Sequence, residues 1–207
     1  MSASISPPDE DGGATARAAD GLDRLRTLAG ALEDPAARTV QTADGQAQAA
    51  VLVPILADGE PKLVLTRRHG NLRRHGGEIS FPGGRHEAGD LTLVETALRE
   101  SEEEIGLRRE HVQLIGALPR TSTFVTNYAI HPFVGVVRGA GRWTLSPREV
   151  DAIIELPLAR IAASRERIEL TRRGFTFETD AFVLDGHTIW GATARIVDEL
   201  LRRAGDW

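Results

Sequence analysis

The most informative stretch of this chain is Gly83–Leu107, which reads GGRHEAGDLTLVETALRESEEEIGL. A glycine-rich turn leads directly into a helical pattern, which Thr92 and Glu95 begin as a capping box and Gly106 ends. Apolar and small residues recur at helical spacing along one stripe, as expected of a helix that packs on a core. The stripe consists of Val94, Ala97, Leu98, Ser101 and Ile105.

A second stripe of the same helix carries three carboxylates. Glu100, Glu103 and Glu104 stand at positions i, i+3 and i+4, so a helix projects them from one face. Each pair of like charges at i, i+4 should destabilise an isolated helix by roughly 0.2–0.5 kcal/mol, which suggests a compensating cation. Oxygen ligands in this number suit Mg²⁺ or Mn²⁺, ions that commonly act on phosphates. A solvated acidic face has the same pattern, so the helix alone leaves both interpretations open.

The segment Arg99–Leu107 resembles the core of the Nudix box, REUxEExGU, in which U is a bulky aliphatic residue, and Gly84 resembles the glycine that opens the box. Three positions depart from the pattern. Asp90 replaces a glutamate, the gap from it to Arg99 is eight residues rather than seven, and Ser101 occupies an aliphatic position. The chain is therefore identified as a member of the Nudix superfamily, which implies an α/β fold, the Nudix α/β/α sandwich with a mixed β-sheet between helices.

A second motif narrows the resemblance to the coenzyme A pyrophosphatase branch, whose signature is LLTxR[SA]xxxRxxxGxxxFPGG. Residues 64–84 follow it, with Val64 in place of leucine and His69 in place of serine or alanine. The branch also has the aspartate and the lengthened gap seen at Asp90, and residues 189–194, IWGATA, are similar to a segment of it. The filled signature positions are Arg68, Arg73, Gly77 and Phe81-Pro82-Gly83-Gly84.

The resemblance implies metal-dependent hydrolysis of the diphosphate of coenzyme A to adenosine 3′,5′-bisphosphate and (acyl-)phosphopantetheine. Glu100, Glu103 and Glu104 would be catalytic residues that hold Mg²⁺ or Mn²⁺, and the ions would neutralise the diphosphate and activate water. The Gly83 carbonyl would be a further metal ligand. Arg99 would orient a glutamate.

The loop that leads into the helix is basic. The planar fork of arginine gives phosphate two parallel charge-assisted hydrogen bonds, so a substrate clamp is expected beside the acidic helix. A solvated basic loop that merely offsets the acidic helix is the alternative. The expected substrate-binding residues are Arg67, Arg68, Arg73 and Gly77.

The hydrolytic water also needs a proton acceptor or a further carboxylate ligand. Glu149 lies in Ser146-Pro147-Arg148-Glu149-Val150, just ahead of an apolar run, so a loop could carry it across to the helix face. We expect Glu149 to be a catalytic residue, with Asp151 as its rival. An ordinary solvated loop carboxylate is the other interpretation.

Composition agrees with one such domain and excludes several classes of protein. The 207 residues contain no cysteine, which excludes disulfides and zinc–thiolate sites, and the net charge of −5 argues against a nucleic-acid binder. No apolar run could span a bilayer, and the N-terminus lacks the features of a signal peptide, so a cytoplasmic protein without a membrane partner is expected. We expect a mobile tail over residues 1–19 and a single Nudix hydrolase domain over residues 20–207. The oligomeric state is left open, a homodimer included.

Other functions remain open on the sequence. The substrate could be another nucleoside diphosphate derivative or a nucleotide, such as ADP-ribose, NADH or a nucleoside triphosphate. A Nudix-like sensor that binds nucleotide without hydrolysing it is a different class, against which the complete glutamate set speaks. An RNA-decapping enzyme is disfavoured by the acidic charge.

The remaining elements are predicted from apolar patterns. A hairpin is expected from residues 49–56 and 63–66, and a strand over 130–137 whose pairing Pro132 interrupts. Residues 175–177 and 182–184 are expected to pair with each other as strands. Amphipathic helices are expected around residues 22–32 and 196–201, with a further strand near 112–118.

Overall fold

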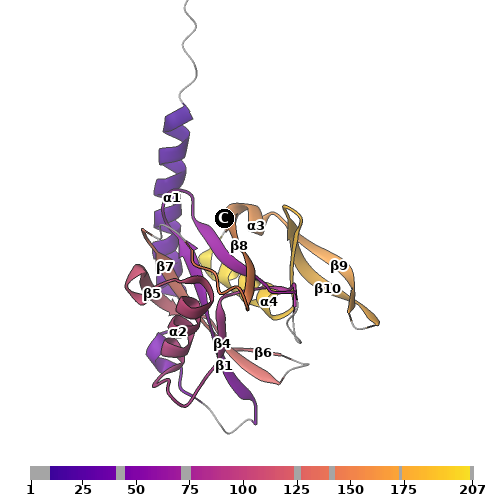
Figure 1. Ribbon diagram of the computed structural model, residues 1–207. Helices are drawn as coiled ribbons and strands as arrows, with labels where there is room; N and C mark the ends of the chain where they lie inside the picture. The colour runs from indigo at the N-terminus through magenta and orange to yellow at the C-terminus, as the bar shows by residue number, and fades with distance from the viewer. Residues whose placement is uncertain are drawn as a thin grey trace, which may run out of the picture.

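The computed structural model describes residues 10–40, 45–70, 76–123, 127–139, 143–172 and 174–205, with residues 10–19 and 22 described in their backbone only (Figure 1). The main sheet is mixed. Strand β1 (Ala47–Leu56) runs parallel to β7 (Tyr128–Val137), and β2 (Lys62–Arg68) pairs antiparallel with β1 and with β8 (Val150–Pro157). The other strands of this sheet are β3 (Ile79–Ser80), β4 (Gly83–Arg85), β5 (Val112–Ala117) and β6 (Thr121–Ser122).

Helices cover both faces of this sheet. Helix α2 (Leu93–Ile105) buries its apolar stripe against one face, where Leu52 and Phe133 lie in the same core. Helices α1 (Glu10–Ala31) and α4 (Gly191–Ala204) share the second core on the other face. The arrangement is the expected α/β/α sandwich with a mixed sheet between helices.

A second, three-stranded sheet projects beside α4 (Figure 1). Its strands are β9 (Arg165–Arg172), β10 (Phe175–Leu184) and β11 (His187–Trp190). The predicted pairing of residues 175–177 with 182–184 is wrong, because both segments belong to β10, which pairs with β9 and β11. Strand β9 is mostly charged and exposed, so it lacks the apolar pattern that would have revealed it. Three short helices, α3 (Leu158–Ala162), η1 (Pro35–Ala37) and η2 (Arg109–His111), complete the described elements.

The predicted hairpin is confirmed, since Ile55 of β1 pairs with Leu63 of β2. The effect of Pro132 is confined to one edge of β7. On the β1 side the ladder continues through Pro132, which pairs with Val51. On the other side β5 ends opposite Phe133 and β6 begins opposite Ile130, so Pro132 lies between two partner strands and costs no ladder bond there.

Helix α1 begins earlier than its apolar pattern predicts. Leu25 and Leu28 are buried in the core, as expected of an amphipathic helix. The helix starts at Glu10, so residues 10–19 are helical rather than part of the tail expected over 1–19. Four alanines between residues 14 and 19 favour this extension. Residues 1–9 lie outside the described part of the chain.

Candidate active site

Helix α2 is held at both ends as its sequence predicts. The Thr92 hydroxyl accepts a hydrogen bond from the backbone N–H of Glu95 at 3.1 Å, and the Glu95 carboxylate accepts one from the N–H of Leu91 at 2.7 Å. At the other end Gly106 takes the left-handed conformation, with φ of 69°. The Ser101 hydroxyl is satisfied within the buried stripe, because it donates to the Ala97 carbonyl at 2.6 Å. The helix therefore presents a defined set of carboxylates to strand β4.

The glycine turn brings the backbone against these carboxylates. Gly83 has φ of 154°, and a Cβ on it would collide with the carbonyl oxygen of Ala50 on β1. A Cβ on Gly84 would collide with the carboxylate of Glu100. Only glycine at position 83 therefore allows strand β4 to lie this close to β1, and a side chain at position 84 would displace the Glu100 carboxylate.

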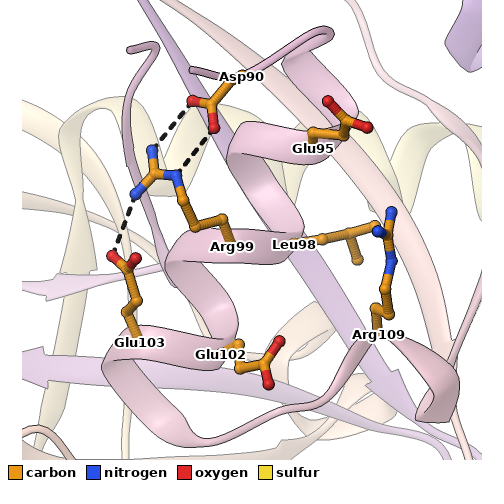
Figure 2. A pocket seen from close by; sticks show the side chains of 7 residues that line it. All are labelled: Asp90, Glu95, Leu98, Arg99, Glu102, Glu103 and Arg109. Atoms are coloured by element: carbon orange, nitrogen blue, oxygen red, sulfur yellow. Dashed lines mark hydrogen bonds and ion pairs between the residues drawn. The ribbon is translucent and has the colours of Figure 1, made fainter. Parts of the chain in front are cut away.

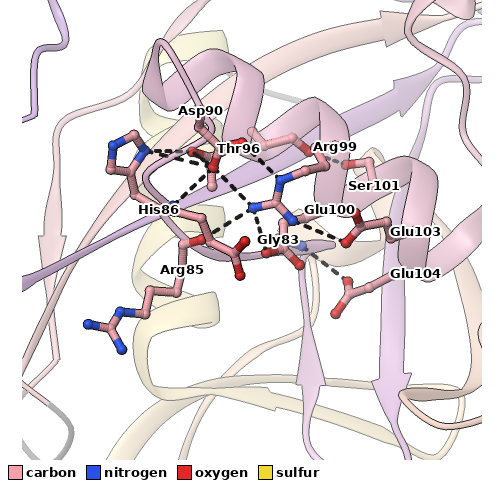
Figure 3. A network of polar contacts seen from close by, with 12 residues as sticks. Gly83, Arg85, His86, Asp90, Thr96, Arg99, Glu100, Ser101, Glu103 and Glu104 are labelled. Atoms are coloured by element: carbon pink, nitrogen blue, oxygen red, sulfur yellow. Dashed lines mark hydrogen bonds and ion pairs between the residues drawn. The ribbon is translucent and has the colours of Figure 1, made fainter.

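Glu104 is the buried member of the cluster, with 2% of its surface exposed. Its Oε2 accepts a hydrogen bond from the Gly83 N–H at 3.1 Å (Figure 3). Its Oε1 lies 3.5 Å from Nη1 of Arg68. Burial raises the pKa of Glu104 from 4.5 to about 7, and the negative charges of Glu100 and Glu149 act in the same direction. Arg68 and the Gly83 N–H lower the pKa but do not offset the burial.

Glu100 and Glu149 stand next to Glu104. Burial is also the largest cause that raises the pKa of Glu100, and the charge of Glu149 contributes to it. Glu149 comes from the loop ahead of β8, yet its charge acts on both helix carboxylates. Glu149 therefore lies within electrostatic reach of the helix carboxylates, and its catalytic role stays a prediction.

Glu103 lies differently from its two neighbours. Its side chain is 58% exposed, and its Oε2 accepts a hydrogen bond from Nη1 of Arg99 at 3.1 Å (Figure 2). In the part of the chain that the structure describes, no group of three histidine, aspartate or glutamate side chains is placed to hold a metal ion. A ligand role for Glu103 would require its carboxylate to turn from Arg99 toward Glu100.

Arg99 is fixed by Asp90, the residue that departs from the usual box. Nε and Nη2 of Arg99 bond the two oxygens of Asp90 at 2.9 and 3.1 Å, and the Thr96 hydroxyl donates to Asp90 at 2.8 Å (Figures 2 and 3). These bonds hold the pKa of Asp90 far below its usual range. Arg99 also lies 3.1 Å from Oε1 of Glu100, so it can orient that glutamate. Asp90 is not among the predicted site residues, although the altered spacing around it is a signal in the sequence.

The pocket in Figure 2 has a volume of about 320 Å³ and lies along the outer side of α2. It is lined by Glu103 and Arg99 but not by Glu100 or Glu104. It therefore does not coincide with the buried carboxylates.

The predicted substrate-binding residues do not all meet at the carboxylates. Arg67 and Arg68 are adjacent on β2 and project to opposite faces of the sheet, so only Arg68 contacts Glu104 while Arg67 is exposed. The Gly77 N–H donates to the Arg68 carbonyl at 2.9 Å, and Gly77 has φ of 75°, so this glycine closes the turn after the loop. Arg73 lies outside the described residues.

Asp151, the rival of Glu149, has a separate partner. Its Oδ2 accepts a hydrogen bond from the Gly70 N–H at 3.2 Å, and its Oδ1 lies 3.6 Å from Nε2 of His69. The register of β8 against β2 shifts at this point, because Arg67 pairs with Ala152 while Arg68 pairs with Val150. Asp151 therefore anchors the end of β2.

The chemistry of the donors fits a divalent cation, although the described side chains are not arranged as three ligands around one ion. Glu100, Glu104 and Glu149 all offer oxygen, which Mg²⁺ and Mn²⁺ prefer, and the pKa values of Glu100 and Glu104 are raised. Deprotonating this cluster places like charges close together in a partly buried space. A bound cation would remove that cost.

The raised pKa of Glu104 predicts a specific dependence of stability on pH. Because the folded pKa of about 7 exceeds the usual 4.5, the folded state binds the extra proton. The free energy of unfolding of metal-free protein should therefore fall as pH rises between these values, by roughly 3 kcal/mol in total. Urea unfolding at a series of pH values measures it. Glu104→Gln should remove most of this slope, and an unchanged slope in that variant would contradict the assignment.

Comparisons with a family model and with curated proteins find similarity to Nudix proteins, and comparison with solved structures finds a similar fold. The model of the NUDIX domain matches residues 46–177. The uncharacterized Nudix hydrolase NudL of Salmonella paratyphi B is 36% identical over 162 residues, which cover 77% of this chain and 84% of that protein. Among solved structures, DR0079 from Deinococcus radiodurans superposes with a TM-score of 0.51 and 17% identity, covering 83% of this chain and 98% of that one, a likeness of fold.

Proposed function

The chain belongs to the NUDIX domain family, and we propose that it is a metal-dependent pyrophosphatase for coenzyme A or its derivatives. As a Nudix hydrolase it cleaves the pyrophosphate linkage of a nucleoside diphosphate derivative. The proposed products are adenosine 3′,5′-bisphosphate and (acyl-)phosphopantetheine. The observation that carries the proposal is the placement of Arg68, a residue of the coenzyme A signature, against the buried carboxylate of Glu104.

The immediate surroundings of Arg68 support a role toward phosphate. Its Nε is buried and has no hydrogen-bond partner among the described residues. Its guanidinium stands beside the cluster of Glu100, Glu104 and Glu149, which has the oxygen donors that Mg²⁺ or Mn²⁺ would need. A diphosphate bound between these groups would meet a guanidinium on one side and a cation on the other.

Each residue then has a distinct part in the proposal. Glu100 and Glu104 would hold Mg²⁺ or Mn²⁺ with the Gly83 carbonyl, and Glu103 would join them after leaving Arg99. The bound ion would supply charge neutralisation and a more acidic water. Glu149 would accept the proton from that water, and Arg68 would orient the diphosphate.

A product-resolved screen tests the substrate. The protein is incubated with coenzyme A, acetyl-coenzyme A, dephospho-coenzyme A, ADP-ribose, NADH and a nucleoside triphosphate, each with Mg²⁺ and with Mn²⁺. The highest kcat/KM is expected for a coenzyme A compound, with adenosine 3′,5′-bisphosphate among the products. Preferred turnover of ADP-ribose, NADH or the triphosphate would assign another Nudix substrate. Binding without product in every case would favour a nucleotide sensor.

Arg68→Gln should raise KM for the preferred substrate, because a charge-assisted contact contributes roughly 1–3 kcal/mol. Arg68 lies at the carboxylates, where the diphosphate is expected. KM should therefore rise equally for coenzyme A and dephospho-coenzyme A, which share the diphosphate and differ only in the 3′-phosphate. Arg67→Gln is the matched control, because the neighbouring arginine projects to the opposite face, and its kinetics should stay near wild type. If KM in Arg68→Gln rises for coenzyme A but not for dephospho-coenzyme A, Arg68 contacts the 3′-phosphate instead. If the kinetics of this variant are normal, Arg68 is not part of the site.

A further inference from the structure

A second pocket, with a volume of about 390 Å³, lies across β1 from the Gly83–Gly84 turn. In the sheet, Ala50 of β1 has Gly84 as its neighbour on one side and His131 of β7 on the other. The pocket shares no lining residue with the carboxylate cluster. Its lining includes Glu33, Arg38 and Thr39 from the segment after α1, Pro119 and Arg120, and His131.

Two residues that line this pocket each have a buried side-chain nitrogen without a hydrogen-bond partner in the described part of the chain. Among the described residues, three buried side-chain nitrogen or oxygen atoms have none: Nε of Arg38, Nε of Arg68 and Nδ1 of His131. Arg68 belongs to the candidate active site, where a substrate phosphate is expected. Arg38 and His131 both line the second pocket. Folded proteins rarely leave such atoms unpaired, so each is a contact point for an ordered water or a ligand.

The hydrogen bonds around His131 define which proton it carries. The side-chain amide nitrogen of Gln48 donates to the Gln46 carbonyl at 3.1 Å, so its Oε1 is the atom that faces His131. Nε2 of His131 lies 2.8 Å from that oxygen and must donate. Burial, with the positive charges of Arg38 and Arg120, lowers the pKa of His131 to about 4, so the ring is neutral near pH 7. Nδ1 is therefore an acceptor.

The charges in the pocket favour an anion. His131 is 97% buried and feels two guanidinium groups, those of Arg38 and Arg120. The one carboxylate in the lining, Glu33, is already paired with Arg38 and lies 3.4 Å from Nη2 of Arg203. Arg38 keeps its Nε–H as a donor, although one of its other nitrogens bonds Glu33 and the Leu118 carbonyl.

We propose that this pocket binds a phosphate oxyanion that carries one O–H group. Its charged oxygens would accept from Arg38 and Arg120, and its O–H would donate to Nδ1 of His131. A carboxylate or a sulfate dianion has no proton to donate at neutral pH and would leave Nδ1 unpaired. Free inorganic phosphate keeps such an O–H near neutral pH and is therefore the expected ligand. The inference rests on the pocket alone and holds whichever nucleotide derivative the enzyme hydrolyses.

Phosphate and sulfate form a matched pair of probes, since both are tetrahedral oxyanions and near neutral pH the phosphate dianion keeps one O–H. The full-length protein is titrated with each, while calorimetry measures Kd and NMR follows the ring nitrogens of His131. Phosphate should bind at least roughly tenfold tighter than sulfate, a factor that corresponds to one hydrogen bond. The NMR spectrum should show Nε2–H as the protonated position and a shift at Nδ1 on binding.

Variants separate this pocket from the active site. Arg120→Gln changes an exposed side chain and should weaken phosphate binding by roughly tenfold or more. His131→Phe should abolish the preference for phosphate over sulfate. If His131→Phe does not fold, Arg120→Gln still tests the proposal. Arg68→Gln is the control at the other site and should leave the His131 response intact. Equal binding of sulfate and phosphate, or a response of His131 that disappears in Arg68→Gln, would overturn the proposal.

A third probe, adenosine 5′-monophosphate, tests whether the ligand must carry an O–H. A phosphate monoester is largely a dianion without O–H near neutral pH, because its second pKa is about 6. Inorganic phosphate is therefore expected to bind tighter than adenosine 5′-monophosphate, and this result with a response at His131 would support the proposal. Tighter binding of adenosine 5′-monophosphate, or no binding of inorganic phosphate at millimolar concentration, would refute it.

Discussion

Replacing Glu104 with glutamine should slow hydrolysis by roughly a thousandfold. The change removes a carboxylate that we propose as a metal ligand, and a metal ion contributes several kcal/mol of transition-state stabilisation. The protein should still fold. The amide is nearly isosteric, its oxygen can still accept from the Gly83 N–H, and the cost of burying a charge disappears. Steady-state kinetics at saturating Mg²⁺ or Mn²⁺ and urea unfolding measure the two effects separately.

Glu102→Gln is the matched control for this variant. Glu102 lies on the same helix and is exposed, and it has no role in the proposed site. Its rate should stay close to that of wild type. If Glu104→Gln retains near wild-type kcat under saturating metal, Glu104 is not a metal ligand. If its rate falls only because the protein unfolds, the experiment shows a structural role instead.

Glu149→Gln is expected to have the second-largest effect, a fall in kcat of roughly a hundredfold to ten-thousandfold, the range that a general base contributes. KM should change far less, because the group acts on water rather than on the substrate. The acid limb of the kcat–pH profile should also change, since protonation of a base causes the loss of rate there. The measurement is a pH–rate profile of both proteins at saturating substrate.

Asp151→Asn separates the base from its rival. Asp151 bonds the Gly70 N–H and lies against His69, so its loss should loosen the loop and affect KM more than kcat. A normal kcat and pH profile in Glu149→Gln, together with a large loss of kcat in Asp151→Asn, would transfer the role to Asp151. Normal profiles in both variants would move attention to Glu104.

Much of the fold follows from local patterns. The ends of α2 are set by Thr92, Glu95 and Gly106, and each signal acts within a few residues, so the sequence predicts the helix well. The charged strand β9 could not be predicted in this way, because its pairing with β10 depends on contacts rather than on an apolar pattern. The effect of Pro132 on strand pairing could not be predicted locally either, because it depends on which strands lie on the two sides of β7.

For the candidate site, local sequence patterns indicate the chemistry, whereas the packing of the fold sets which groups meet. The glycine turn, the glutamates at helical spacing and the arginines of the signature are encoded locally, because helix and strand periods place side chains on defined faces. Only the packing of β4, α2 and the loop before β8 buries Glu104, brings the charge of Glu149 to it and leaves Glu103 exposed with Arg99. Burial and proximity depend on residues far apart in the chain. They therefore set the pKa of about 7 at Glu104, which no stretch of sequence specifies alone.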